Sequence, residues 1–248
     1  PMSDIIVIKI GTGVLTRENG TLDGSSLVRL VTSVAALQAQ GHHCIMVSSG
    51  AVGAGVSALG LESYPDDVES RQAAAAVGQA RLMHRYETLF QQFDLNVAQL
   101  LLTSSDLEEN RDRVSATMRR LLDHGSIVPI VNENDSVAIE ELRFGDNDML
   151  SAKVAELLKA NQLILFTTVD GLMPPEGGDI IEEVSSVDEV LDFARDESGK
   201  FSIGGMASKL KAVGYATNCG VQVTIANGRK PEQLSDLVAG KGRGTRFL

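Results

Sequence analysis

Short apolar runs that end abruptly in polar or glycine-rich segments recur along the chain and limit what it can fold into. Four of them finish at residues 9–13, 48–55, 132–135 and 167–170. Apolar runs of this kind are typical of strands buried on both faces, and the segments between them show helical periodicity. We therefore predict an α/β fold, a three-layer α/β/α sandwich around a mainly parallel sheet. The polar run ends should converge at one edge of that sheet, where ligands bind.

Composition fits one domain of this class. The chain has 248 residues, of which 43% are hydrophobic and 4% aromatic, and its net charge is −11. We expect a single domain over residues 1–248 with reduced thiols at Cys44 and Cys219, as in cytoplasmic proteins. The acidic balance argues against nucleic acid or an anionic membrane as a partner, because both need a basic face. No apolar run approaches the roughly 20 residues of a membrane span.

The apolar run at 127–131 leads into Asn132-Glu-Asn-Asp135, and Gly145-Asp-Asn-Asp148 follows ten residues later. The second cluster opens a helix, because apolar residues recur at helical spacing from Leu150 to Leu158. One of its polar residues could serve only as the N-cap. A cap needs one such residue, whereas three stand in a row beside a further acidic cluster. We interpret both clusters together as a ligand site.

Two lysines occupy positions that are unfavourable for a positive charge. Lys9 interrupts the apolar run 5–10 just before Gly11-Thr-Gly13, and Lys209 follows Gly204-Gly205 in the first turn or two of a predicted helix. The helix dipole disfavours a cation at that position. Lys9 could instead reach solvent from an edge strand, and Lys209 could be an ordinary solvated lysine. We favour contacts with phosphate for both.

The segment 48–55 is rich in glycine at positions 50, 53 and 55. Such a segment lets the backbone approach a ligand and point N–H groups at an anion, so we predict an anion cradle. The alternative is a glycine-rich connection chosen for tight packing. Neither GxGxxG nor GxxxxGK[ST] occurs in the chain, so the sequence supports neither a dinucleotide-binding nor a P-loop assignment.

Other elements follow from caps and periodicity. We expect a helix at 25–40 ended by Gly41, a long helix at 69–93, and a charged helix capped by Ser105 or Asp106 and ending near Gly125. The sequence also predicts a capping box at 186–189 before a helix through Arg195, an edge strand at 244–247, and a short hairpin arm at 137–144.

Two lysines near glycine turns, several carboxylates and no metal-type His or Cys cluster favour phosphoryl transfer over hydrolysis or redox chemistry. None of the four histidines stands beside a motif. A kinase acting on a hydroxyl usually needs a base, whereas a carboxylate acceptor is already ionised at neutral pH. The absence of an obvious base therefore fits an acyl-phosphate product.

The chain resembles the glutamate 5-kinase family within the amino acid kinase superfamily. The resemblance covers nearly the whole chain and rests on an ordered set of motifs: Val7-Ile-Lys-Ile-Gly-Thr12, Ser48-Ser-Gly-Ala51, Ala76-Val-Gly-Gln79, Val131-Asn-Glu-Asn-Asp135, Gly145-Asp-Asn-Asp148, Gly204-Gly-Met206 with Lys209, and Gly244-Thr-Arg-Phe247. It implies an enzyme that converts ATP and L-glutamate to L-glutamyl 5-phosphate and ADP with Mg²⁺, the first step of proline biosynthesis.

The resemblance also implies residue roles. Lys9 and Lys209 would neutralise the transferring phosphoryl group, and Asp148 would orient them. The glutamate site would comprise Ser49, Gly50, Asp135, Asp146 and Asn147. The ATP site would comprise Lys9, Gly11, Thr167, Thr168, Ile203, Gly204, Gly205, Met206, Ala207, Ser208 and Lys209. No residue is assigned to a metal.

Some family features differ here. Thr168 stands where the family often has Asp, Ile203 replaces a usual Thr, and residues 173–178 lack a common Asp-Pro-Arg, so adenine and ribose recognition should differ. We expect no RNA-associated C-terminal PUA domain. The resemblance further implies a homodimer or homotetramer and feedback inhibition by L-proline. The rival readings are a relative acting on another carboxylate, a carbamate or a phosphate, and a non-catalytic nucleotide-binding protein.

Overall fold

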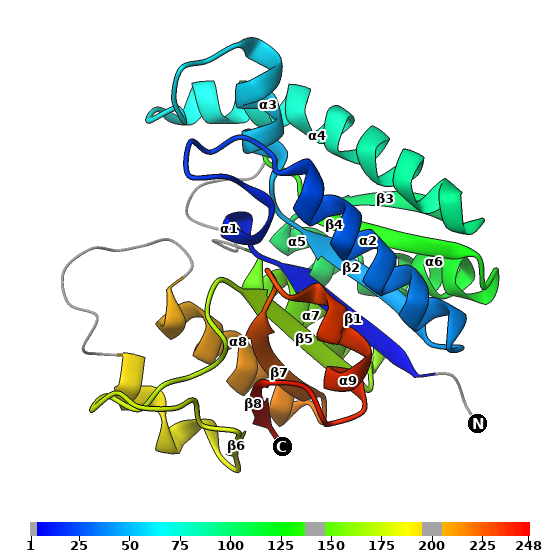
Figure 1. Ribbon diagram of the computed structural model, residues 1–248. Helices are drawn as coiled ribbons and strands as arrows, with labels where there is room; N and C mark the ends of the chain where they lie inside the picture. The colour runs from blue at the N-terminus through cyan, green and yellow to red at the C-terminus, as the bar shows by residue number, and fades with distance from the viewer. Residues whose placement is uncertain (1–3, 137–146, 195–204) are drawn as a thin grey trace.

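The computed structural model describes residues 4–136, 147–194 and 205–248. Within them the chain forms one sheet in the order β3-β4-β2-β1-β5-β7-β8-β6 (Figure 1). The strands are β1 (Ile5–Ile10), β2 (His43–Ser48), β3 (Asn96–Leu102), β4 (Ile127–Glu133), β5 (Gln162–Thr167), β6 (Glu183–Val184), β7 (Gln222–Asn227) and β8 (Gly244–Phe247).

The sheet is mainly parallel, as the apolar runs predict. Neighbouring strands pair in parallel along the stretch β3-β4-β2-β1-β5-β7 of the sheet. Strand β8 then pairs antiparallel with β7. The expected edge position of residues 244–247 is wrong, because β6 pairs with the outer side of β8. That strand has only two residues, too few to produce a periodic pattern.

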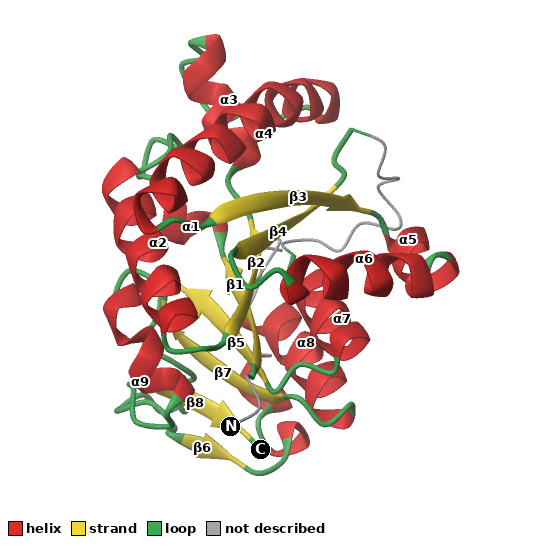
Figure 2. Ribbon diagram, turned by 90° about the vertical axis from the view of Figure 1, so that its right-hand side faces the viewer, coloured by secondary structure: helices red, strands yellow, loops and turns green. Residues whose placement is uncertain are grey.

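Helices cover both faces of the sheet (Figure 2). One apolar layer joins the sheet to α2 (Gly24–Ala39), α4 (Val68–Phe90) and α9 (Leu234–Val238), and the other joins it to α6 (Arg111–Asp123), α7 (Asp148–Leu158) and α8 (Met206–Asn218). In β1, Ile6, Ile8 and Ile10 pack into the first layer and Val7 into the second. The alternation of side chains along a strand thus builds both layers at once, and the predicted sandwich is confirmed.

Two predicted helices differ in detail. The charged segment begins two or three residues earlier than expected, because Thr103, and not Ser105 or Asp106, is the N-cap and forms a capping box with Asp106; the segment divides at Asn110 into α5 (Ser104–Glu109) and α6. Ser186 caps nothing with its side chain, and two 3-10 segments follow it, η3 (Val187–Glu189) and η4 (Leu191–Ala194). By contrast α2 ends as predicted before Gly41, whose φ is 95°.

Short helices follow the first two strands: α1 (Thr12–Leu15) after β1 and α3 (Ala51–Leu59) after β2. A further turn, η1 (Gln91–Phe93), follows α4, and η5 (Pro231–Gln233) precedes α9. Because β1, β2, β4 and β5 are parallel, their carboxyl ends share one edge of the sheet, as expected. The predicted hairpin arm at 137–144 lies outside the described residues. No helix among the described residues is long and apolar enough to cross a membrane.

Candidate active site

Three charged side chains meet at the carboxyl edge of the sheet. Lys9 Nζ lies 2.7 Å from Asp148 Oδ1, and Lys209 Nζ lies 3.0 Å from Asp148 Oδ2. Lys9 and Asp148 are 0% exposed and Lys209 is 6% exposed. Charges this deeply buried are stable only when paired, and each oxygen of the carboxylate takes one lysine. We call these three residues the lysine–aspartate triad.

The triad is assembled from three separate elements. Lys9 stands near the end of β1, in the middle of the sheet, so its interpretation as an edge-strand lysine is wrong. Asp148 is the first residue of α7. Lys209 lies in the opening turns of α8 and is buried, so its interpretation as a solvated lysine is also wrong. The triad carries one more positive than negative formal charge, which suits an anionic ligand.

Gly11 borders this triad directly. A Cβ at Gly11 would lie 3.6 Å from Lys9 Nζ and 3.2 Å from the carbonyl oxygen of Phe166. The N–H of Gly11 donates to that same Phe166 oxygen at 3.1 Å. A side chain at Gly11 would therefore crowd the ammonium group of Lys9 and the Phe166 carbonyl, and the N–H of Gly11 is already bonded to β5.

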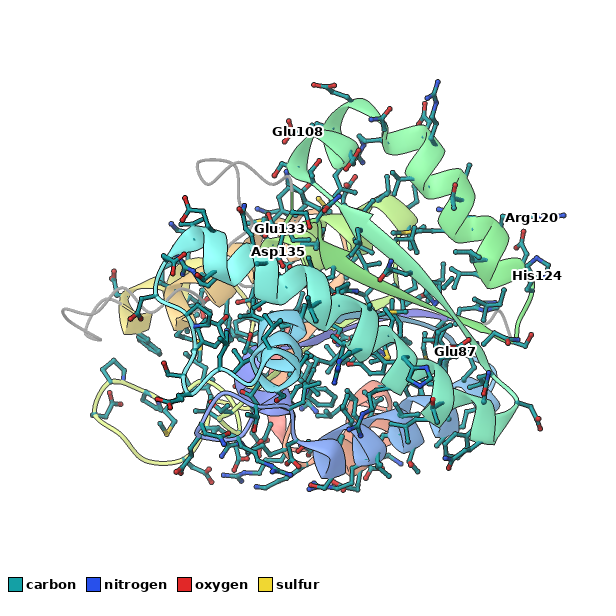
Figure 3. The ribbon with its side chains drawn as sticks, turned by 90° about the horizontal axis from the view of Figure 1, so that it is seen from above. Glu87, Glu108, Arg120, His124, Glu133 and Asp135 are labelled. Atoms are coloured by element: carbon teal, nitrogen blue, oxygen red, sulfur yellow. The ribbon has the colours of Figure 1, made fainter. Side chains whose placement is uncertain are left out.

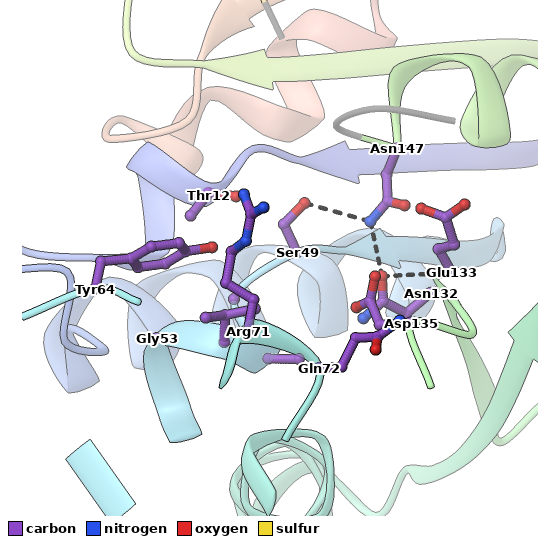
Figure 4. Close-up of a pocket in the computed structure, with 13 residues that line it drawn as sticks. Thr12, Ser49, Gly53, Tyr64, Arg71, Gln72, Asn132, Glu133, Asp135 and Asn147 are labelled. Carbon is purple, nitrogen blue, oxygen red and sulfur yellow. Dashed lines mark hydrogen bonds between the residues drawn. The ribbon is translucent and has the colours of Figure 1, made fainter. Parts of the chain in front are cut away.

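A cavity of about 360 Å³ opens at the same edge of the sheet. Its walls come from the ends of β2 and β4, the starts of α1, α3, α4 and α7, and Tyr64 (Figure 4). The lining residues are Thr12, Ser49, Gly50, Ala51, Val52, Gly53, Tyr64, Arg71, Gln72, Asn132, Glu133, Asp135 and Asn147. Of the residues assigned to glutamate by resemblance, the cavity includes Ser49, Gly50, Asp135 and Asn147. Asp146 lies outside the described residues.

Asn147 connects the cavity to the triad, because it directly precedes Asp148. It occupies the N-cap position of α7 with φ 69° and ψ 3°, a left-handed conformation that Asn adopts more readily than most residues. Its side chain makes no cap hydrogen bond. Instead Nδ2 donates to Asn132 Oδ1 at 2.8 Å and to Ser49 Oγ at 3.3 Å (Figure 4). The alternative that the cluster serves only as an N-cap is therefore wrong for Asn147, whose amide faces the cavity.

The glycine-rich segment has a different role from the predicted anion cradle at two of its glycines. A Cβ at Gly53 would lie 2.5 Å from the carbonyl oxygen of Gly20, and a Cβ at Gly55 would lie 1.9 Å from that of Ala74. Both glycines stand inside α3 and allow close packing, which is the alternative stated above. Gly50, with φ 105°, forms the turn that starts α3 at the cavity.

The residues assigned to ATP by resemblance lie on two neighbouring elements. Thr167 ends β5, and Gly205 to Lys209 form the N-cap and opening turn of α8. Thr168 packs against α1, since a Cβ at Gly13 would lie 2.9 Å from Thr168 Cγ2. Ile203 and Gly204 lie outside the described residues.

Arg71 is a cavity residue that the sequence prediction missed. It is the one Lys, Arg or His among the described residues lining the cavity, and Figure 4 shows it among the other residues that line the cavity. Its Nε is buried without a hydrogen-bond partner among the described residues. A usable signal existed, because Arg71 stands four residues after the N-cap Asp67, as Lys209 does after Gly205. Both are cations in a helix's opening turn, where the dipole disfavours them.

The carboxylates lie at the end of β4. Figure 3 shows Glu133 and Asp135 close together beside α4, far from His124 and Glu87 at the other end of the strands. Tyr64 also lines the cavity, and burial raises its pKa, with Arg71 opposing that shift. The cavity therefore holds groups of both charges: two carboxylates on one wall and a guanidinium on another.

Comparison with known proteins gives a consistent result. Residues 4–227 match the model of the amino acid kinase family. A glutamate 5-kinase from Clostridium acetobutylicum is 42% identical over 98% of this chain and 94% of its own length. One from Symbiobacterium thermophilum is 44% identical over 98% of this chain and 95% of its own length. Among solved structures, carbamate kinase from Giardia lamblia bound to AMP-PNP aligns with a TM-score of 0.70 and 16% identity, over 100% of this chain and 99% of its own. That structural likeness supports the fold.

Proposed function

The chain belongs to the amino acid kinase family, and on that premise we propose that it transfers the γ-phosphoryl group of ATP to the side-chain carboxylate of L-glutamate. The products are L-glutamyl 5-phosphate and ADP, and the step belongs to proline biosynthesis. The relatives that match nearly their whole length are named glutamate 5-kinases. The observation that carries the proposal is the adjacency of Asn147, which lines the cavity, and Asp148, which joins the two lysines.

The charges in the cavity suit an amino acid with free α-groups. Asp135 and Glu133 supply negative charge for an α-ammonium group. Arg71 supplies a planar donor for a carboxylate, which guanidinium groups bind in bidentate fashion. N-acetylglutamate and carbamate have no ammonium group to offset the two carboxylates, and a phosphate acceptor would be repelled by them. Glutamate therefore fits this cavity better than those rival acceptors.

The reaction needs positioning and charge stabilisation more than proton transfer. One oxygen of the glutamate side-chain carboxylate attacks the γ-phosphorus, the bond to the β,γ-bridging oxygen breaks, and ADP leaves with that electron pair. No proton must be removed from an ionised carboxylate, and none of the described residues lining the cavity is a histidine. Lys9 and Lys209 would stabilise negative charge on the transferring group, and Asp148 would hold both ammonium groups in place.

We propose that Mg²⁺ enters with ATP. Mg²⁺ in kinases is bound by substrate phosphates and one or two carboxylates, not by a dedicated protein cage. The described residues contain no group of three or more His, Cys, Asp or Glu side chains arranged for a metal. Asp148 already has both oxygens beside lysines. The ion would supply charge neutralisation at the phosphates, and we assign it no protein ligand.

The decisive experiment measures ADP release with glutamate, aspartate, N-acetylglutamate, carbamate and UMP as acceptors. We expect release with glutamate, and trapping by hydroxylamine should convert the acyl phosphate to a hydroxamate. Release with another acceptor instead would move the protein to a different branch of the family. Release with none, under conditions in which ATP binds, would favour a non-catalytic nucleotide-binding protein.

Three further expectations remain predictions. Inhibition by L-proline can be tested in the same assay, and a homodimer or homotetramer by sedimentation. A cytoplasmic location is supported by Cys44 and Cys219, which are both free thiols.

A further inference from the structure

Gln79, a residue of α4 outside the cavity lining, is connected to that lining by side-chain amides. Its Oε1 accepts a hydrogen bond from Asn132 Nδ2 at 3.0 Å, and its Nε2 donates to Gln99 Oε1 at 2.9 Å. Asn132 in turn accepts from Asn147 Nδ2. Gln79, Asn132 and Asn147 are all buried, and Gln99 stands on the exposed edge strand β3. We call Gln99, Gln79, Asn132 and Asn147 the amide chain.

The direction of every hydrogen bond in the amide chain is fixed by one backbone group. The N–H of Glu133 donates to Asn132 at 2.8 Å, and a backbone N–H can only donate. The Asn132 atom that it meets is therefore the oxygen, so the NH₂ of Asn132 must face Gln79. Gln79 consequently presents its oxygen to Asn132 and its NH₂ to Gln99.

The same reasoning fixes what the cavity offers a ligand. Asn147 must turn its NH₂ toward Asn132 Oδ1, and the second hydrogen of that NH₂ faces Ser49 Oγ. Asn147 then offers a ligand its carbonyl oxygen, an acceptor. Ser49 accepts from Asn147, so its own hydroxyl hydrogen is the group it can donate. An acceptor beside a donor suits a ligand that has both an ammonium and a carboxylate group.

We propose that Gln79 is a positioning residue for the acceptor substrate: by accepting from Asn132 Nδ2 it holds in place the amide whose direction the Glu133 N–H fixes, and it thereby keeps Asn147 and Ser49 in position toward glutamate. The proposal rests on the proposed function for the identity of the substrate. Gln79 itself contacts neither substrate nor nucleotide. Without its oxygen, the buried NH₂ of Asn132 loses its acceptor, and the three groups that hold the Asn132 amide are reduced to two, the N–H of Glu133 and the NH₂ of Asn147.

The test uses two substitutions at one position. Gln79→Met keeps the length of the side chain and removes both polar atoms, whereas Gln79→Glu keeps an oxygen acceptor toward Asn132. Gln38→Met is the matched control, because Gln38 is a glutamine of α2 at 8% exposure, against 9% for Gln79. Gln38 also makes two hydrogen bonds, with Gly125 O and Cys44 N, away from the cavity.

We expect Gln79→Met to raise KM for glutamate by about tenfold while leaving KM for ATP within about twofold. For Gln79→Glu, KM for glutamate and KM for ATP should each stay within about threefold of the wild-type value. A purely structural role would not require this. Gln38→Met should lower stability without separating the two KM values. Equal KM changes for glutamate and ATP in Gln79→Met, or a Gln79→Glu variant as impaired as Gln79→Met, would overturn the proposal.

A second measurement does not depend on activity. In protein labelled with ¹⁵N-asparagine, exchange of the Asn132 side-chain hydrogens should be slow in the wild type and in Gln79→Glu, and clearly faster in Gln79→Met. Unchanged exchange in Gln79→Met would contradict the amide chain. If the wild type forms no product from glutamate, the proposed function fails, and the exchange rates still decide whether Gln79 holds Asn132.

Discussion

Two aspartates at the carboxyl edge of the sheet each lie between two cations, and they differ in burial. Asp148 lies between Lys9 and Lys209 and is fully buried. Asp170, just beyond β5, lies between Lys230 and Arg243, with the three side chains 30%, 58% and 52% exposed. Water and salt screen the second group, while the first acts in a low-dielectric interior. The charges around Asp170 therefore join three surface segments, whereas those around Asp148 form the group that we propose binds an anion.

Removing a cation from the buried group should produce the largest effect. We expect Lys9→Ala or Lys209→Ala to lower kcat by roughly 10²–10³-fold, by analogy with the removal of one charge-stabilising donor. Steady-state ADP release at saturating substrates measures this, with circular dichroism to verify folding. Lys230→Ala is the matched control from the exposed group and should change kcat by less than about twofold. Near-normal turnover in both buried-lysine variants would remove the proposed role of the triad.

Asp135→Ala tests the cavity beside the triad and should act on substrate binding more than on turnover. Loss of the carboxylate facing the α-ammonium group should raise KM for glutamate by about tenfold or more. Asp170→Asn is the control, because Asp170 is an aspartate at the same edge of the sheet that does not line the cavity. The ratio of KM values for glutamate and ATP is the measurement. An increase confined to ATP would show that the acceptor side is assigned wrongly.

Asp170→Asn should have only a small effect on stability, of about 0.5–1 kcal/mol. The hydrogen bond from Asn227, followed by that from Lys230, lowers the pKa of Asp170 below its ordinary value of 3.8. A carboxyl whose folded-state pKa is lowered stabilises the fold above its unfolded pKa, and this contribution disappears as the pH falls through the folded pKa. Urea unfolding of wild type and variant should therefore differ at about pH 7 and converge as the pH falls below 3.8, and added salt should reduce the difference. A difference that persists in acid would mean that packing, not charge, is lost.

The two cysteines extend the comparison of burial to a group outside the site. Burial raises the pKa of the Cys44 thiol to about 12, whereas Cys219 is exposed. Because the thiolate is the reactive form, we expect a thiol-specific reagent to modify Cys219 in the native protein and Cys44 only after unfolding. Absorbance of the released reagent group should report one thiol per folded chain. Cys219→Ser should abolish the native reaction, and any fast residual reaction would contradict the burial of Cys44.

Several of these features were predictable because a single residue broke a local rule. Lys9 interrupts an apolar strand, and Lys209 places a cation in the opening turn of a helix, so both indicated a site before any geometry was known. The structure brings the two lysines to one carboxylate. Parallel pairing likewise followed from apolar runs separated by helices. Such signals are local, and a sequence displays them directly.

Other features depend on contacts between distant segments. Asn147 looked like a possible cap. Its side-chain amide instead donates hydrogen bonds to Ser49 and Asn132, which lie 98 and 15 residues away in the sequence. Gln79 belonged to a family motif with no assigned role, because its partner Asn132 is 53 residues distant. Arg71 carried the same local signal as Lys209, but no adjacent glycine turn marked it. Side-chain partners across a fold do not follow from spacing alone.

The close contact of α3 with α4 limits how the cavity can be redesigned. A Cβ at Gly78 would lie 1.7 Å from the carbonyl oxygen of Ala51, and one at Gly55 would lie 1.9 Å from that of Ala74. Even a methyl group at either position would push the two helices apart and shift Gln79 away from Asn132. A library that varies Gly78 should therefore yield inactive enzymes with no new acceptor. Variation at Arg71 and Gln72, which line the cavity, offers the practical route to a kinase with a different amino-acid substrate.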